Sequence, residues 1–317
     1  MKQFAVVTTI NGRTPAIEKL ERRGDWTIVV VGDLKTPEVK ESDNLVFLSV
    51  ERQKELGFGF TEYCPFNHYS RKNIGFLYAM REGADVIFDM DDDNLPSSLW
   101  SNPSFTCNMR VKSDNKFINI YKHFTNQNIW PRGLPLDEID SGFTTMNSKP
   151  IALGVLQSMS DRAPDVDAIY RLTRGTDLFY FRQAPTICVP EGIWTPFNSQ
   201  CSFWTKEAFS FLYLPATVRF RYTDILRGYL AQKLLWDRKL CVGFCNAYIA
   251  QDRNVHDLMV DFESELNLYL DIKKVVASIE NITGGLESLY ETLASAGLVD
   301  ERELLAVSAW TKDVSKL

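Results

Sequence analysis

The chain has 317 residues, with 35 Lys and Arg against 41 Asp and Glu, so its net charge is −6 and its pI is near 5.3. Apolar residues make up 45% and charged residues 24%, which is ordinary globular composition and excludes a disordered or collagen-like chain. The acidic balance argues against nucleic acid and against an anionic membrane surface as partners. The length favours one large α/β domain or two unequal domains.

The sequence carries no signal for a membrane or for export. No apolar run approaches the roughly 18 residues that a membrane-spanning helix needs. Residues 1–7 show neither the apolar core nor the cleavage site of a secretory leader and instead begin a strand. The six cysteines match no zinc-binding spacing, and we expect buried free thiols. We therefore predict a soluble, cytoplasmic protein without a membrane span.

Strands and helices alternate over the first 93 residues. Thr14 is a typical N-cap and Pro15 favours the first helical position, so a helix begins there; a second is expected over residues 70–83. Strands are expected over residues 5–10, 27–31, 45–50 and 85–90. Such alternation predicts a mostly parallel sheet, whose ligands bind beyond the carboxyl ends of the strands.

The rest of the chain divides into two parts. Residues 100–200 are rich in Pro, Asn, Ser and aromatic residues, which indicates loops and short strands around a site. Helices are expected over residues 223–236, 257–282, 286–296 and 301–314, and a strand over 241–245. Residues 252–317 hold 13 acidic and 6 basic residues, against 28 and 29 in residues 1–251. We predict a nucleotide-binding catalytic domain over residues 1–254 and an acidic helical C-terminal subdomain over residues 255–317.

Three consecutive carboxylates, Asp91, Asp92 and Asp93, follow the fourth expected strand. Such carboxylates repel one another unless a cation is present, and Mn²⁺ and Mg²⁺ prefer carboxylate oxygens. In a turn at the end of a strand, Asp91 and Asp93 face the same way and Asp92 points elsewhere. The spacing therefore predicts a metal on Asp91 and Asp93 that neutralises the diphosphate of a nucleotide sugar. The alternative is a solvated Asp-rich turn.

Two other segments carry charges suited to a nucleotide. Asp33, at the end of the second expected strand, can accept from a uracil or ribose donor, while Lys35 can meet a phosphate; an ordinary turn is the alternative. Arg71, Lys72 and Asn73 open the helix before the fourth strand. Cations at a helix N-terminus oppose the helix dipole, which suggests an anionic ligand there; a solvated basic turn is the alternative.

Eight short blocks, in order, resemble the STELLO-type glycosyltransferase domain. They are VTTIN (7–11), VGDLKTP (31–37), RKNIGFLYA (71–79), DMDDDN (89–94), WPRG (130–133), DVDAIYRLT (165–173), PFNSQ (196–200) and DILRGY (224–229). The same frame is more distantly similar to the reversibly glycosylated polypeptides, which are UDP-arabinopyranose mutases.

The resemblance implies a GT-A (Rossmann-like) fold, a UDP-sugar donor and a Mn²⁺ or Mg²⁺ ion. Asp91, Asp92 and Asp93 match the metal-binding acidic triplet of the family. Arg132 falls where the mutases carry the arginine that becomes glycosylated, although an Arg beside Trp can also simply stack on the ring. Asp224 falls on an acidic motif whose carboxylate commonly faces the acceptor, and a helix N-cap is the alternative.

The third metal ligand stays open between two residues. The mutases carry a histidine shortly after the last strand, where this sequence places Gln251, while His256 follows five residues later. We assign His256 to the metal. The remaining donor contacts are assigned to Thr8, Asn11, Asp33, Lys35, Arg71, Asn73, Asp92, Asn198 and Arg253.

These observations predict a metal-dependent glycosyltransferase that moves a sugar from a UDP-sugar to a glycan or other hydroxyl acceptor. If the reaction inverts, Asp224 deprotonates the acceptor; if it retains, Asp224 positions it. The alternatives are a UDP-sugar mutase that uses Arg132, and a silent GT-A scaffold that partners a polysaccharide synthase or forms a homo-oligomer. A nucleotidyltransferase is disfavoured because residues 8–13 hold one glycine.

Overall fold

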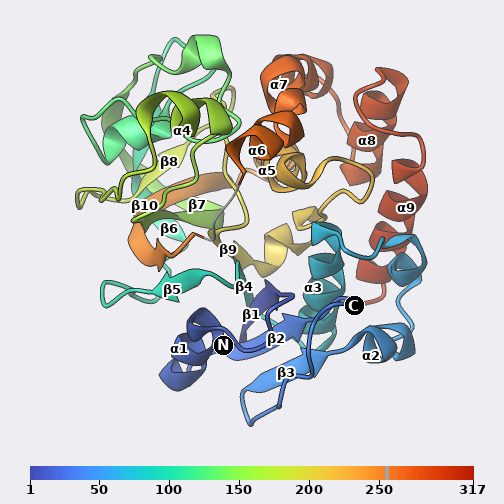
Figure 1. Cartoon of the computed structure of the whole chain (residues 1–317). Helices are drawn as coiled ribbons and strands as arrows, with labels where there is room; N and C mark the ends of the chain where they lie inside the picture. The colour runs from blue at the N-terminus through green and yellow to red at the C-terminus, as the bar shows by residue number, and fades with distance from the viewer. Residues whose placement is uncertain (254–256) are drawn as a thin grey trace.

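The computed structural model describes residues 1–253 and 257–317. These ranges form a mixed α/β structure with one large central sheet and helices at the C-terminal end (Figure 1). The strands are β1 (Gln3–Thr8), β2 (Thr27–Val31), β3 (Leu45–Leu48), β4 (Val86–Met90), β5 (Asn94–Pro96), β6 (Thr106–Lys112), β7 (Thr144–Asp161), β8 (Ile187–Val189), β9 (Cys201–Thr205) and β10 (Cys241–Gln251). The α-helices are α1 (Pro15–Arg23), α2 (Val50–Glu55), α3 (Lys72–Arg81), α4 (Ala168–Arg174), α5 (Thr223–Asp237), α6 (Leu258–Ser264), α7 (Leu266–Ile279), α8 (Leu286–Ser295) and α9 (Glu303–Val314).

The N-terminal half of the sheet follows the expected pattern. Strands β3, β2, β1 and β4 lie side by side in that order and run parallel. Thr14 caps α1, since its hydroxyl accepts from the Ile17 amide, and Pro15 is the first helical residue, as predicted. The third strand ends at Leu48, two residues earlier than expected, because Ser49 caps α2.

The other half of the sheet corrects the prediction of a mostly parallel sheet. Strand β9 runs antiparallel to both β4 and β7, and β7 runs antiparallel to β6. Among the described residues of this half, the parallel pairings are β7 with β10, one residue pair between β6 and β8, and an isolated bridge between Phe117 and Trp194. A parallel pair needs a long crossover, usually helical, and residues 94–222 contain one short α-helix, α4. Here the sheet is therefore largely antiparallel.

Helices α1 and α3 cover opposite faces of the parallel strands. The strand side chains alternate, so Ala5 and Val7 face the α1 side whereas Val6 faces the α3 side. Gly75 allows α3 to approach closely, because a Cβ atom at this position would lie 2.5 Å from methyl groups of Val6 and Val31. The start of α3 is thereby fixed at the carboxyl edge of the strands.

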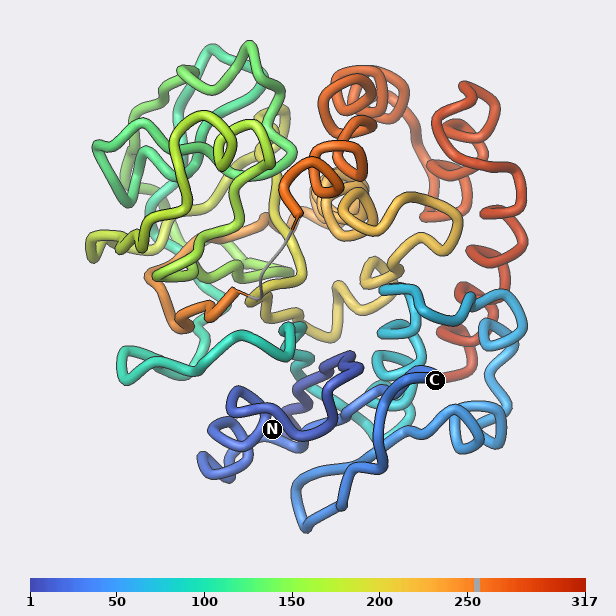
Figure 2. Tube along the Cα trace, viewed as in Figure 1, coloured from blue at the N-terminus to red at the C-terminus, as the bar shows by residue number. Residues whose placement is uncertain are grey.

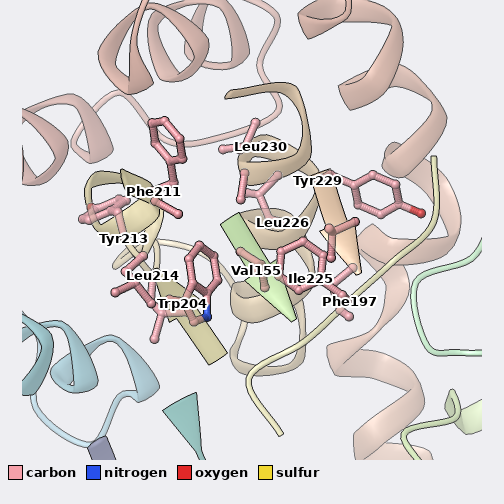
Figure 3. Packing of buried hydrophobic residues seen from close by; sticks show 14 of the residues in the cluster. Val155, Phe197, Trp204, Phe211, Tyr213, Leu214, Ile225, Leu226, Tyr229 and Leu230 are labelled. Carbon is pink, nitrogen blue, oxygen red and sulfur yellow. The ribbon is translucent and has the colours of Figure 1, made fainter. Parts of the chain in front are cut away.

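Helix α5 is buried along most of its length and carries the central core of the second half (Figure 3). Its residues Ile225 and Leu226 lie in one hydrophobic cluster with Val155 of β7 and Trp204 of β9, and Tyr229 packs against Trp194. The predicted helix over residues 223–236 is confirmed almost to the residue.

The C-terminal helices share this core. The helix expected over residues 257–282 is broken into α6 and α7 at Glu265, whose carboxylate is buried. Helix α9 returns to the N-terminal half (Figure 2), where it packs against the 3-10 turn Gly59–Tyr63 and Asp313 accepts from the Phe60 amide at 2.8 Å. None of the helices in the described part of the chain is both long and apolar enough to cross a bilayer.

The cysteines agree with the sequence prediction. All six are free thiols, with five buried and Cys241 half-buried.

Candidate active site

A cavity of about 510 Å³ lies along one edge of the sheet. Strands β1, β2 and β4 end at this edge, and β9 begins there because it runs in the opposite direction. Strand β7 is antiparallel to β9 and parallel to β10, so both β7 and β10 also end at this edge. The strand order therefore lays out the cavity from Asp33 after β2, through Asp91 after β4, to Gln251 at the end of β10.

The structure brings most of the predicted residues to this cavity. Those lining it are Thr8, Asn11, Asp33, Lys35, Arg71, Asp91, Asp92, Asp93, Arg132, Asp224 and Arg253. Asn73 and Asn198 do not line it, and His256 lies outside the described residues.

The end of the cavity nearest β2 is open and polar. Lys35 and Asn11 are exposed and Asp33 is half-buried. Asp92 belongs to this end, since its Oδ2 accepts from Thr9 Oγ1 at 2.6 Å and from Asn11 Nδ2 at 3.2 Å. Asp92 thus binds the loop after β1, in keeping with the expectation that it points away from its two neighbours. We call this part, with Asp33, Lys35 and Asn11, the β2 end.

Asp91 lines the cavity and contacts two donors, the half-buried Tyr69 and the buried Lys72. Its Oδ1 accepts from the Tyr69 hydroxyl and, at 3.1 Å, from Lys72 Nζ. Burial raises the pKa of Asp91 to about 7, against the opposing effect of the Lys72 cation. Asp91 is therefore a carboxylate whose ionised form needs more positive charge than the protein around it supplies.

Asp93 has an oxygen available to a ligand. Its Oδ2 accepts from Gln251 Nε2 at 2.9 Å, whereas its buried Oδ1 has no hydrogen-bond partner among the described residues. Burial also raises the pKa of Asp93. A buried carboxylate oxygen without a partner is costly unless a cation or a donor meets it.

The donors at this point suit a hard divalent cation. Within residues 1–253 and 257–317, no three His, Cys, Asp or Glu side chains are grouped as a complete metal site. Mg²⁺ is usually held by one or two carboxylates together with ligand phosphates and water. Asp91 and Asp93 fit that pattern, in which the ligand completes the coordination sphere.

A fully buried ionic cluster lies beneath Asp91. Lys72 Nζ lies 2.7 Å from Asp89 Oδ1, and Arg227 Nη1 lies 2.8 Å from Asp89 Oδ2. All three side chains are at most 1% exposed, so each charge depends on the others for stabilisation. The charge of Lys72 is therefore paired with carboxylates of the protein. The conflict of this cation with the helix dipole no longer indicates an anionic ligand at Lys72.

A second buried cluster forms one wall of the cavity. Arg132 binds Asp224 through two bonds, Nη1 to Oδ1 at 3.0 Å and Nη2 to Oδ2 at 2.8 Å, and its Nε donates to Asp165 Oδ1 at 2.8 Å. Burial alone would lower the pKa of Arg132, but the two carboxylates hold it above its usual value. Asp224 is therefore a partner of Arg132, and no side chain caps α5.

Ser199 connects the two clusters. Arg227 Nη2 donates to the Ser199 hydroxyl at 2.8 Å, and the Ser199 amide donates to Asp224 Oδ2 at 3.3 Å. A continuous chain of alternating charges thus runs under the cavity from Asp91 to Asp165. We call this chain of residues the ionic floor: Asp91, Lys72, Asp89, Arg227, Ser199, Asp224, Arg132 and Asp165.

The C-terminal helices hold two further arginines at the same wall. Arg253 Nη2 donates to Asp261 Oδ2, and Arg221 Nε donates to Glu265 Oε1, each at 2.5 Å. Glu265 is fully buried and also accepts from the Ala168 amide at 2.7 Å. Glu265, at the break between α6 and α7, therefore holds Arg221 and the first residue of α4 in place beside the cavity.

Three predicted donor contacts have other partners. Asn73 is buried, and its amide pairs with the backbone of Leu214 in both directions. Asn198 donates to Asp165 Oδ2 at 2.6 Å, which makes it a support for the ionic floor. Arg71 lines the cavity, yet its guanidinium donates to Gln53 Oε1 and to a backbone carbonyl.

Three residues of the site, Asp89, Arg227 and Tyr69, are not among those predicted from the sequence. A signal existed for the first two, because a carboxylate inside an apolar strand needs a buried cation. The matching cation, on the buried face of the helix expected over residues 223–236, lies 138 residues away. No local pattern joins the two.

The chain is similar to two proteins of Arabidopsis thaliana. It is 26% identical over 343 positions to the probable glycosyltransferase STELLO1, and 25% identical over 342 positions to the probable glycosyltransferase STELLO2. Each alignment covers 99% of this chain and 44% of the relative, so the chain spans about half the length of the curated relatives it matches. No protein-family model matches the chain. The similarity over nearly the whole chain confirms the resemblance to STELLO-type glycosyltransferases that the motifs predicted.

Proposed function

We propose that this chain is a glycosyltransferase domain that takes a UDP-sugar as donor and Mn²⁺ or Mg²⁺ as cofactor. The observation that carries the proposal is that the Asp91–Asp93 triplet lines a cavity at the carboxyl ends of parallel strands, where α/β sheets bind their ligands. The similarity to two probable glycosyltransferases supports the same class of reaction. The proposal requires only one part of a GT-A fold, the four parallel strands β3, β2, β1 and β4.

The proposed donor lies along the cavity with its nucleoside at the β2 end. Asp33 accepts from the base or ribose, and Lys35 is an exposed cation for a phosphate. Asp91 and Asp93 hold the metal at the diphosphate. When bound, the metal supplies positive charge that stabilises the leaving diphosphate. Arg253 lies on the same side as Asp93 and adds a fixed cation near that position.

The ionic floor assigns Asp224 a positioning role. Each carboxylate oxygen of Asp224 accepts a hydrogen bond from the Arg132 guanidinium. Asp224 also accepts from the Ser199 amide, so both of its oxygens are occupied. We infer that Asp224 orients Arg132 and the cavity wall rather than removing a proton from the acceptor.

The test is incubation with UDP-glucose, UDP-galactose, UDP-xylose and UDP-arabinopyranose, each radiolabelled in the sugar, with Mn²⁺; water serves as the acceptor, so cleavage of a donor yields UDP and the labelled free sugar. We expect release of UDP from at least one donor by the wild type, and none above background by Asp93→Asn. Asp43→Asn is the matched control, because Asp43 is an exposed carboxylate away from the cavity. No release from any donor would contradict the proposal. Label that stays on the protein and is lost in Arg132→Lys would favour the mutase instead.

A further inference from the structure

One exposed aromatic ring that lines the cavity is not among the proposed contacts to the donor. Phe220 lines the cavity and is 57% exposed. It lies in a short 3-10 turn, Phe220–Tyr222, directly before α5. Leaving a large ring in water has a cost in free energy, and pockets use such rings as contact surfaces for ligands.

The segment that carries Phe220 is fixed to the rest of the fold. The fully buried carboxylate of Glu303 in α9 accepts from the amides of Ala216 at 2.8 Å and Thr217 at 2.7 Å. His68 Nε2 donates to the Val218 carbonyl at 3.1 Å. The ring is therefore presented from a held backbone, which lowers the entropy lost on binding.

Phe220 also lies next to the centre of the site. Its ring packs edge-to-face against Tyr69, with 5.3 Å between the ring centres. The Tyr69 hydroxyl donates to Asp91. The exposed ring is thus linked through Tyr69 to Asp91, one of the carboxylates proposed to hold the metal.

A polar group without a partner lies two residues before Tyr69. Asn67 lines the cavity, is exposed, and has a φ of 51°, a left-handed conformation that Asn tolerates better than most residues. Among the described residues, no hydrogen bond engages its side chain. The amide offers two donors and an acceptor to a ligand.

We propose that Phe220 and Asn67 form a subsite for a pyranose ring of the acceptor, so that the acceptor is a glycan. This inference rests on the function proposed above. A pyranose presents an apolar C–H face beside hydroxyl groups, and an aromatic ring and a free amide that line the same cavity complement both. The nucleoside belongs at the β2 end and the donor sugar beside the triplet, so the exposed ring at the mouth meets the molecule that arrives from solvent.

The experiment measures binding of methyl pyranosides by saturation-transfer NMR. Methyl glycosides of glucose, galactose, mannose and xylose are titrated into the full chain with and without UDP and Mn²⁺, and UDP affinity is measured separately by calorimetry. We expect at least one pyranoside to bind the wild type. Phe220→Ala should weaken that binding about tenfold while UDP affinity is unchanged, and Phe220→Trp should keep both.

Two further variants isolate the subsite. Asn67→Gly removes the amide but keeps the left-handed backbone accessible, and it should weaken pyranoside binding about threefold. Tyr180→Ala is the matched control, because Tyr180 is 62% exposed and does not line the cavity; it should leave binding unchanged.

The outcomes separate this inference from the proposed function. The subsite is overturned if none of the four pyranosides binds, if Phe220→Ala binds them as well as the wild type, or if Phe220→Ala loses UDP affinity, which would make the ring a platform for the nucleotide. A wild type that binds a pyranoside through Phe220 but does not bind UDP supports the subsite and contradicts the UDP-sugar donor.

Discussion

The two ends of the cavity differ in how their charges are held. At the β2 end, Lys35 is exposed and Asp33 is half-buried, and their surroundings are loops. At the opposite wall, Arg132 and Asp224 are 6% and 7% exposed and lie in the ionic floor. Exposed charges can bind a ligand with little effect on folding, whereas buried charges depend on their partners and stabilise the fold itself. The charges at the β2 end can therefore be changed with little effect on folding, whereas the fold depends on the charges of the ionic floor.

The largest expected effect is a loss of folding stability when a buried charge of the ionic floor is removed. Arg132→Met leaves Asp165 and Asp224 buried without their cation, and removal of one partner of a buried ion pair costs roughly 3–5 kcal/mol. We expect the free energy of unfolding, measured with urea, to fall by that amount. Lys35→Met should change it by less than about 0.5 kcal/mol. Equal losses in the two variants would contradict the distinction between the ends.

The pH dependence of stability tests the same wall through Asp167, which caps α4 and accepts from the Trp130 indole at 2.7 Å. Burial raises the pKa of Asp167 to about 6, above the value of about 3.9 in an unfolded chain. The folded protein therefore holds this proton more tightly, and its contribution to stability is present below pH 4 and lost as the pH rises through 6. The shift corresponds to roughly 3 kcal/mol.

The measurement is urea unfolding of the wild type and Asp167→Asn from pH 4 to pH 7. Asn does not titrate, so we expect the wild type to lose roughly 2 kcal/mol relative to this variant across the range, because part of the full effect is already lost at pH 4. Two curves that stay parallel between pH 4 and pH 7 would show that Asp167 has an ordinary pKa.

The smallest expected effect concerns binding at the β2 end. Lys35→Ala removes one exposed cation, so we expect calorimetry to show UDP binding weakened about threefold with no change in the melting temperature. Lys54→Ala is the control, because Lys54 is equally exposed on α2 and does not line the cavity. A melting temperature lowered in Lys35→Ala alone would show that this end also supports the fold.

The sequence predicts the parallel half of the fold better than the other half, for a physical reason. Runs of β-branched residues and the Thr14-Pro15 start of a helix are local signals. The parallel pairing of the strands follows from the alternation of strands and helices along the chain. The 18 residues of β7 and its antiparallel partners were expected as loops and short strands. Their pairing depends on contacts between distant segments, which no local pattern encodes.

The same limit applies to the candidate site. The prediction that Asp33, Asp91 and Asp93 share one edge needs only the topology of parallel strands, and the structure places them there. The pairing of Asp89 with Arg227 needs the fold of the whole chain, so the ionic floor could not be predicted. Asn73 and Asn198 were predicted as ligand contacts because a polar residue in a motif gives no sign of whether its partner is the ligand or the protein.

The most direct test of the account is calorimetric titration of UDP into the chain with and without Mn²⁺. We expect Mn²⁺ to tighten UDP binding by at least about tenfold in the wild type and in Asp43→Asn, and to have no effect in Asp93→Asn. The result that would contradict the account is a wild type that fails to bind UDP in the presence of Mn²⁺, or one that binds it equally well without the metal.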